Sequence, residues 1–221
     1  MEPWAKLISA LSLSLILTAY LIIEIKNLRS ATYVYILQAL LMCTLFLTFA
    51  GQNPRLYYWA LTALVTKVFI IPYAILRTIR RTKVLEVSPV IGYLGSIIFM
   101  TLVAVFFYRI THSYVDFIAP TPLATQEPFR TNLAVSLALF VMGLYCILVR
   151  RDAIKIVLGL TIMQNGVHLS LVTLVPLLEE TGLIGIVTDL VIAVVLLLYI
   201  TQGVYQKFGT TDTLHLKGLR W

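Results

Sequence analysis

Three ionisable residues stand inside long apolar runs of this sequence, where a charged side chain is costly. Lys67 lies in TKVFIIP, His168 in MQNGVHL and Asp189 in GIVTDLVIAVV. Ionisable side chains within membrane-spanning segments usually face a protein interior or water, and they often mark ion routes. We therefore interpret Lys67, His168 and Asp189 as candidate members of a proton relay.

Lys67 falls near the middle of its apolar run, so its amine has a long way to reach the headgroups. Pro72, five residues later, cannot donate a backbone hydrogen bond to the carbonyl of Val68, which predicts a kink and a free acceptor near the lysine. Burial disfavours the charged form of an amine and so allows it to gain and lose a proton. The alternative is a structural ion pair with another subunit.

The second polar group is a stripe in LGLTIMQNGVHLSLV. Thr161, Gln164, Asn165 and His168 are separated by offsets of three, four and seven residues, which places them on one helical face. An imidazole preceded by hydrogen-bonding side chains can relay protons. The alternative is interhelical hydrogen bonding, which we favour for Gln164 and Asn165 because neither titrates.

Asp189 lies about two turns inside the last apolar run, next to Thr188, which could help to satisfy it. An aspartate there must be protonated, paired or hydrated. Lys67 and Asp189 are the obvious opposite charges deep in the runs, so a direct or water-bridged pair is one hypothesis, and a hydrated wall residue is the other. Glu24, beside Lys26 at the end of the first run, is expected to be solvated.

The sequence offers no catalytic constellation of its own. It has no Gly-rich phosphate loop, zinc spacing, haem attachment motif or Ser/His/Asp set. Cys43 and Cys146 are lone residues in apolar runs, which is typical of buried small hydrophobes rather than of a metal site. We expect the chain by itself to be no enzyme, and to bind no metal and no cofactor.

Composition indicates the elements that must hold these residues. Hydrophobic residues make up 60% of the 221 residues and charged residues 12%, with a mean hydropathy of +0.93. A helix needs roughly 20 apolar residues to cross a membrane. We predict an all-α polytopic membrane protein of about seven transmembrane helices, with spans near 6–25, 31–50, 56–76, 89–109, 131–149, 153–177 and 182–205.

Positive charge predicts the orientation of these helices. The net charge of +7 comes from short basic groups beside apolar runs, such as Arg150, Arg151 and Lys155, which we interpret as topology signals and headgroup contacts rather than as nucleic-acid binding. The first, third and fifth loops are basic. They should face the cytoplasm, with the N-terminus outside and the C-terminus inside.

Prolines divide the chain into parts. The stretch 111–130 contains Pro120, Pro122 and Pro128 and is predicted to be an external connecting loop. It follows an N-terminal four-helix membrane segment, 1–110. It precedes a three-helix segment, 131–205, and a cytoplasmic tail, 206–221.

The last three spans resemble the small antiporter-related component of complex I, called the K subunit or chain 4L. The likeness lies in GLYCILVRRDAIKIVLGLTIMQNGVHL, followed by the acidic Asp189 in the next helix. The whole chain is similar to the longer hydrogenase-4 component E family, through its seven-span plan and through TKVFIIP, MQNGVHL and GIVTDLVIAVV.

The resemblance implies a membrane-arm subunit of a group 4 nickel–iron hydrogenase or formate hydrogenlyase-like complex in the cytoplasmic membrane of a prokaryote. Such a protein would contribute to proton or sodium translocation coupled to electron transfer. Its partners would be antiporter-like and H-like membrane subunits, a hydrophilic nickel–iron and Fe–S arm, and lipid. Carried over by position, Lys67, His168 and Asp189 would join the polar axis of the membrane arm.

Two positions depart from the pattern of these relatives. The K subunit usually has a glutamate at the position of Thr161. The component E pattern has a glutamate at the position of Gln164, reading MENG rather than MQNG. Neither side chain here can take a proton. A non-conducting anchoring subunit of the same complex, or a subunit of a multisubunit cation/proton antiporter, therefore remains as an alternative hypothesis.

Overall fold

The computed structural model describes residues 3–51, 54, 56–87, 92–122, 124–174 and 180–213. Within these ranges the chain is helical apart from short turns and two isolated backbone bridges. The elements are α1 Pro3–Glu24, α2 Leu28–Ala50, α3 Leu56–Ala63, the π-helix η1 Leu64–Ile70, α4 Ile71–Thr82, α5 Tyr93–Ile118, α6 Phe129–Val149, α7 Ala153–Leu174 and α8 Glu180–Phe208.

Seven helical stretches in the described part are long and apolar enough to cross a membrane. One of them, Leu56–Thr82, joins α3, η1 and α4 into a single rod. The predicted all-α fold with seven spans is confirmed, and the chain is a multi-pass membrane protein. The predicted fourth span, 89–109, was placed too early, because α5 begins at Tyr93 and continues to Ile118.

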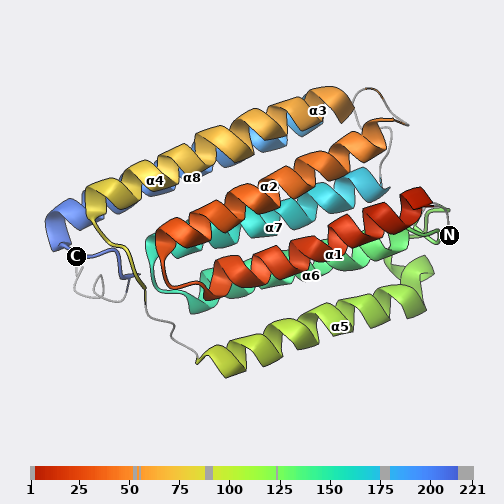
Figure 1. The fold of residues 1–221 in the computed structure, drawn as a ribbon, viewed down its shortest axis with the longest axis horizontal. Coiled ribbons are helices and arrows are strands. Elements are labelled where there is room, and N and C mark those ends of the chain that lie inside the picture. The colour runs from red at the N-terminus through yellow and green to blue at the C-terminus, as the bar shows by residue number, and fades with distance from the viewer. Residues whose placement is uncertain are drawn as a thin grey trace.

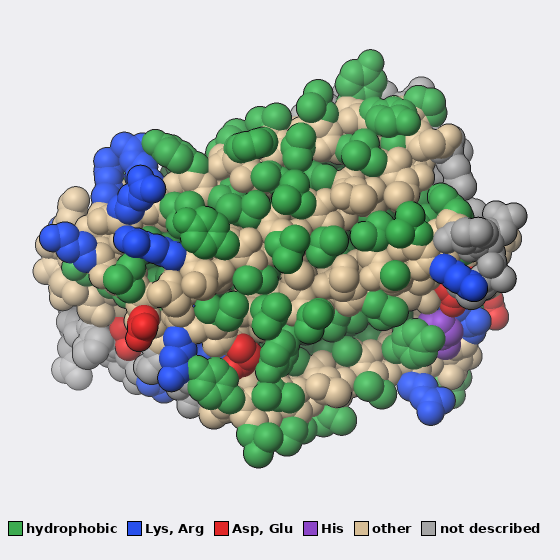
Figure 2. Space-filling view, in the orientation of Figure 1, with side chains coloured by type: hydrophobic (Ala, Val, Ile, Leu, Met, Phe, Trp, Pro, Cys, Tyr) green, Lys and Arg blue, Asp and Glu red, His purple; other side chains and the backbone are tan. Residues whose placement is uncertain are grey.

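The helices lie side by side in a flattened bundle (Figure 1). The rod α3–η1–α4 and α8 form one edge and α5 the other, with α1, α2, α6 and α7 between them. Buried side chains from both the N-terminal and the C-terminal helices form one continuous apolar core. The outer faces of the bundle carry many exposed hydrophobic side chains, as a membrane protein requires (Figure 2).

Close contact between α6 and α7 depends on glycine. A Cβ atom on Gly143 would lie 2.4 Å from the backbone nitrogen of Met163, and one on Gly166 would lie 2.6 Å from the carbonyl oxygen of Ser136. Neither neighbour is the flexible end of a side chain, so the helices could not stay at this separation. Gly166 thus permits the close packing that fixes α7 against α6.

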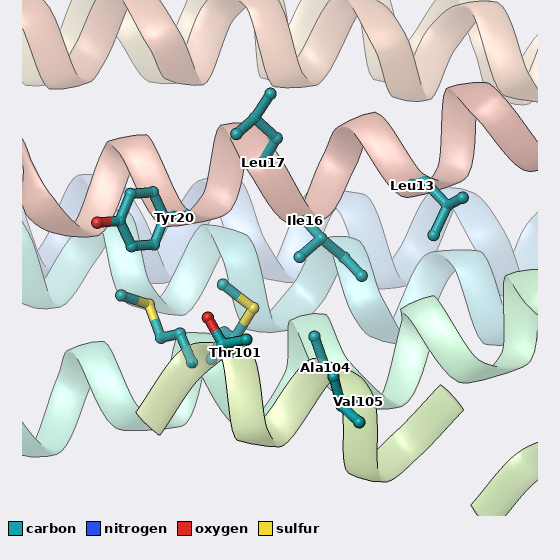
Figure 3. Close-up of a pocket in the computed structure, with 9 residues that line it drawn as sticks. Leu13, Ile16, Leu17, Tyr20, Thr101, Ala104 and Val105 are labelled. Carbon is teal, nitrogen blue, oxygen red and sulfur yellow. The ribbon is translucent and has the colours of Figure 1, made fainter. Parts of the chain in front are cut away.

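Helix α5 is held less closely. Between α5 and α1 lies a pocket of about 370 Å³, lined chiefly by apolar side chains. Leu13, Ile16 and Leu17 reach it from α1, while Ala104 and Val105 face it from α5 (Figure 3).

At the predicted cytoplasmic end of the bundle, the Asp152 side chain joins the start of α7 to the segment after α8. Asp152 caps α7 by accepting hydrogen bonds from the backbone nitrogens of Ile154 at 2.9 Å and Lys155 at 3.1 Å. Thr211, beyond α8, donates to the other carboxylate oxygen at 2.5 Å. Burial raises the pKa of the Asp152 carboxyl, and these three hydrogen bonds oppose that shift.

The glycine contacts predict the effect of one methyl group. Gly143→Ala should destabilise the protein by about 1–3 kcal/mol, because the Cβ must push two backbones apart. Gly203→Ala is the matched control: a Cβ there meets nothing within 4 Å, so it should be neutral or slightly stabilising. Thermal unfolding of the purified variants in detergent measures both, and equal stability of the two would contradict the packing argument.

Candidate proton-relay site

A π-helical segment places Lys67 inside the bundle. The N–H of Ile71 donates to the carbonyl of Thr66, five residues earlier, which is the spacing of a π-helix. Pro72 follows directly and has no N–H, so the α-helical hydrogen-bond ladder cannot run through this point. The sequence predicted a disturbed helix at this proline, and in the structure the π-helix η1 comes directly before it. π-helical turns within α-helices are frequent at functional sites.

The Lys67 side chain is fully buried, and its amine contacts two side chains of α7. Its Nζ donates to Oδ1 of Asn165 at 2.6 Å and lies 2.7 Å from Nδ1 of His168. A charged Lys67 can only donate, so His168 would then be neutral with its proton on Nε2. That Nε2 is buried and has no hydrogen-bond partner among the described residues. A proton on it is therefore positioned for a partner that the described part of the chain does not supply.

The polar contacts continue from Asn165 across the bundle. Asn165 Nδ2 donates to Oε1 of Gln38 on α2 at 3.2 Å, and Gln38 Nε2 donates to the carbonyl of Leu15 on α1 at 3.2 Å. Asn165 and Gln38 are fully buried. Leu15, Gln38 and Lys67 each lie near the middle of their own span. The line of contacts thus runs sideways through the membrane rather than from one surface to the other.

Aromatic rings close one side of the site. The Trp59 ring meets His168 edge to face, with centroids 5.3 Å apart, and it stacks on Phe46 at 4.3 Å. Trp59 is almost fully buried, and its Nε1 has no hydrogen-bond partner among the described residues. The rings thus pack against one flank of the imidazole, and Trp59 Nε1 joins His168 Nε2 as a buried nitrogen without a partner among the described residues.

The structure brings together only some of the predicted residues. Lys67, His168 and Asn165 meet. Thr161 is buried but donates to the carbonyl of Leu158 in its own helix at 2.7 Å, and Gln164 is half-buried on the same face.

Thr188 and Asp189 are exposed near the start of α8. The hypothesis of a direct ion pair between Lys67 and Asp189 is therefore wrong for the described chain: the amine is enclosed by α7 while the carboxylate faces outward. The reason is rotational, since the face of α8 that packs against the core carries Leu190, Val194 and Leu198 instead.

Sequence reasoning missed Gln38 and Trp59. Gln38 is a lone amide in an otherwise apolar run, ILQALLM, and that isolation is the signal that marks a buried interhelical partner. Trp59 carried no signal, because an aromatic residue near a span end usually belongs to the interfacial belt.

A second polar cluster lies at the predicted cytoplasmic end. Glu24, expected to be solvated, is only 7% exposed, and its Oε1 lies 2.7 Å from Nη2 of Arg150 in a buried ion pair. Ser96 donates to the same oxygen, and the Tyr145 hydroxyl donates to Ser96 at 2.9 Å. The expectation for Glu24 was wrong because a residue far along the chain, just beyond α6, supplies its counter-ion.

Lys155 was also misassigned as a headgroup contact. It is 1% exposed, and its Nζ donates to the carbonyls of Ile22 at 2.5 Å, Ile23 at 3.2 Å and Ile25 at 2.7 Å. A cation that binds the last carbonyls of a helix stabilises its C-terminus. Of the three basic residues in this loop only Arg151 is exposed, so Arg150 and Lys155 hold α1 and not lipid.

Comparison with known proteins finds one match to the C-terminal part of the chain and another to nearly its whole length. Residues 131–221 match the family model for NADH-ubiquinone/plastoquinone oxidoreductase chain 4L. This segment, called the chain 4L segment below, is therefore similar to that family. Hydrogenase-4 component E of Escherichia coli K12 is 28% identical over 210 residues, covering 93% of this chain and 94% of the relative. The same values hold for the proteins of that name from Escherichia coli O157:H7 and Shigella flexneri. No solved structure matches significantly.

The resemblance read from the sequence is confirmed on both counts. The chain 4L segment contains Asn165 and His168, whereas Lys67 and Gln38 come from the part that only the component E relatives cover. The candidate relay therefore spans the boundary between the chain 4L segment and the helices that precede it.

The buried ion pair predicts a large loss of stability when one partner is removed. Glu24→Gln should cost about 3–5 kcal/mol, because Arg150 would remain buried without a counter-ion. Arg151→Gln changes an exposed charge in the same loop and should stay within about 0.5 kcal/mol of the wild type. Chemical unfolding in detergent, followed by tryptophan fluorescence, compares the two. A Glu24 variant as stable as the Arg151 variant would mean that the pair is not buried.

Proposed function

We propose that this chain is a membrane subunit of a complex I-like hydrogenase and that it contributes to proton or sodium translocation. Similarity to hydrogenase-4 component E over nearly its full length and the chain 4L segment support the assignment to such a complex. The observation that carries a translocating role is a fully buried lysine, in the middle of a membrane span, bound to an imidazole at 2.7 Å.

Lys67 and His168 form the exchanging pair. When Lys67 is charged it donates to Nδ1 of His168, and transfer of that proton moves the charge onto the imidazole, which can release it from Nε2. Asn165 and Gln38 do not titrate. They hold the amine in position and tie it to α1 and α2.

Asp189 acts outside this pair. An exposed carboxylate within a membrane span is costly against lipid, so in the assembled complex a neighbouring subunit must cover it with a basic or hydrated surface. Asp189 is then the point where the relay passes to an antiporter-like partner. H-like membrane subunits and a hydrophilic nickel–iron and Fe–S arm complete the complex, and this chain itself binds no cofactor and catalyses no redox step.

The site of action is the cytoplasmic membrane of a prokaryote, with the N-terminus outside. The basic loops support this orientation. Glu24, Arg150 and Lys155 then fix the bundle on the cytoplasmic side, and α5 and α8 offer exposed apolar faces to lipid or to neighbouring subunits.

One observation favours a second function, that of an anchoring subunit that carries no ions. Thr161 and Gln164 occupy positions at which the pattern of the families that this chain resembles has a glutamate. The contacts beyond Lys67 are made by neutral amides. A third function is that of a subunit of a cation/proton antiporter without a redox partner. The neighbouring genes distinguish it from the hydrogenase. Genes for a nickel–iron large subunit and Fe–S proteins support the hydrogenase, and antiporter genes alone support the third function.

Substitution of the lysine tests the relay. In the intact complex reconstituted into vesicles, Lys67→Met should lower ion pumping by about tenfold or more while hydrogen production under uncoupled conditions persists, because the exchanging group is gone. Lys67→Arg keeps the charge but cannot release a proton, so it should fail as well. Thr161→Val, whose hydroxyl bonds only its own helix among the described contacts, is the control and should pump normally.

The three variants separate the hypotheses. Normal pumping by Lys67→Met would exclude a relay through this residue. Pumping restored by Lys67→Arg alone would make Lys67 a fixed charge rather than a carrier. Loss of the assembled complex in Lys67→Met and Lys67→Arg, with no change in pumping per complex, would favour the anchoring function.

A further inference from the structure

A groove of about 320 Å³ lies where α4 and α8 pack along each other. Both helices end at the predicted cytoplasmic side, and they run in the same direction at one edge of the bundle (Figure 1). Gln202 on α8 lies level with Thr78 and Arg81 on α4, since its side chain bonds both. Tyr73 and Tyr199, which line the groove, are 66% and 74% exposed, so it opens on the outer surface of the bundle rather than toward the core.

One end of the groove is cationic. Arg77 and Arg81, one helical turn apart on α4, both line it, and none of the described residues that line it is acidic. Arg81 Nη1 donates to Gln202 Oε1 at 2.8 Å, and Gln202 Nε2 donates to Thr78 Oγ1 at 2.7 Å. This contact orients the Arg81 guanidinium, which has five N–H donors and so can bind a phosphate as well.

The other end of the groove is apolar. Ile70 and Tyr73 on α4's side and Val195 and Tyr199 on α8 line it, and all four side chains are at least 40% exposed. From Arg77 to Ile70 the helix rises about 10 Å toward the membrane interior. The surface thus changes from cationic to apolar along the direction in which a phospholipid lies. Figure 2 shows Lys and Arg gathered at this end of the molecule, with hydrophobic side chains beside them.

We propose that this groove is a specific site for one anionic phospholipid. Its headgroup phosphate lies between Arg77 and Arg81, and one acyl chain follows the groove past Tyr73 and Val195. Charge complementarity selects the anionic headgroup, and the apolar half selects a lipid over a soluble anion. The proposal needs only the membrane location of the chain, and it stands or falls independently of ion translocation.

Lipid retention tests the site. The full chain is purified in detergent and offered phosphatidylglycerol or phosphatidylcholine with identical acyl chains, and bound lipid is measured by native mass spectrometry. The wild type should retain phosphatidylglycerol in preference to phosphatidylcholine. The double variant Arg77→Gln/Arg81→Gln should lose phosphatidylglycerol binding by about tenfold or more, because each arginine near the headgroup contributes to attraction.

The control removes the same net charge from nearby. Arg29→Gln/Arg80→Gln takes away two exposed cations from the same end of the bundle, and neither residue lines the groove. This variant should keep phosphatidylglycerol binding within about twofold of the wild type. Equal losses in the two double variants would show diffuse attraction to surface charge and would overturn the site.

Two further outcomes also decide the proposal. Gln202→Ala leaves every charge in place but frees Arg81, so a smaller loss of phosphatidylglycerol with unchanged thermal stability supports the geometry even where the double variant folds poorly. Equal retention of the two lipids by the wild type, or a helix of a neighbouring subunit seated in the groove of the intact complex, would exclude a phospholipid there.

Discussion

An amine in the apolar interior of a membrane protein is tolerated only where polar groups meet it. Lys67 has such partners at 2.6 and 2.7 Å, both on α7, and a large part of the bundle serves to keep them there. The π-helical turn before Pro72 lets the lysine point into the bundle, and Gly143 and Gly166 hold α7 in place against α6. Without either device the amine would lose its partners and incur the desolvation cost of several kcal/mol.

The other polar contacts support the same arrangement. Gln38 accepts a hydrogen bond from Nδ2 of Asn165, so the amide that holds Lys67 is itself held by a second helix. At the predicted cytoplasmic end, Lys155 binds the last carbonyls of α1, and Arg150 pairs with Glu24. These two cations belong to the chain 4L segment and bind the first helix, which joins the two parts of the chain into one core.

The sequence predicted the elements well because membrane spans depend on one strong signal, the length of an apolar run. It also singled out Lys67 and His168, which the structure brings into contact, and placed Asn165 on one face with His168, since each inference needs only a single helix. Contacts between helices were beyond its reach. Gln38 and Lys67 are separated by a loop and by an unknown rotation of two helices, and the rotation of α8 decides that Asp189 faces outward. Glu24, Arg150 and Lys155 were misjudged because charges beside spans usually face headgroups, and here they face each other and the end of α1.

The most direct test of the account is the environment of His168 Nε2 in an experimental high-resolution map of the assembled complex. A relay requires that this buried N–H, which has no partner in the described chain, meets ordered water or a polar group of a neighbouring subunit. We predict such a partner within about 3 Å. Dry apolar packing on every side of Nε2 would contradict the relay and leave Lys67 as a structural tie between helices.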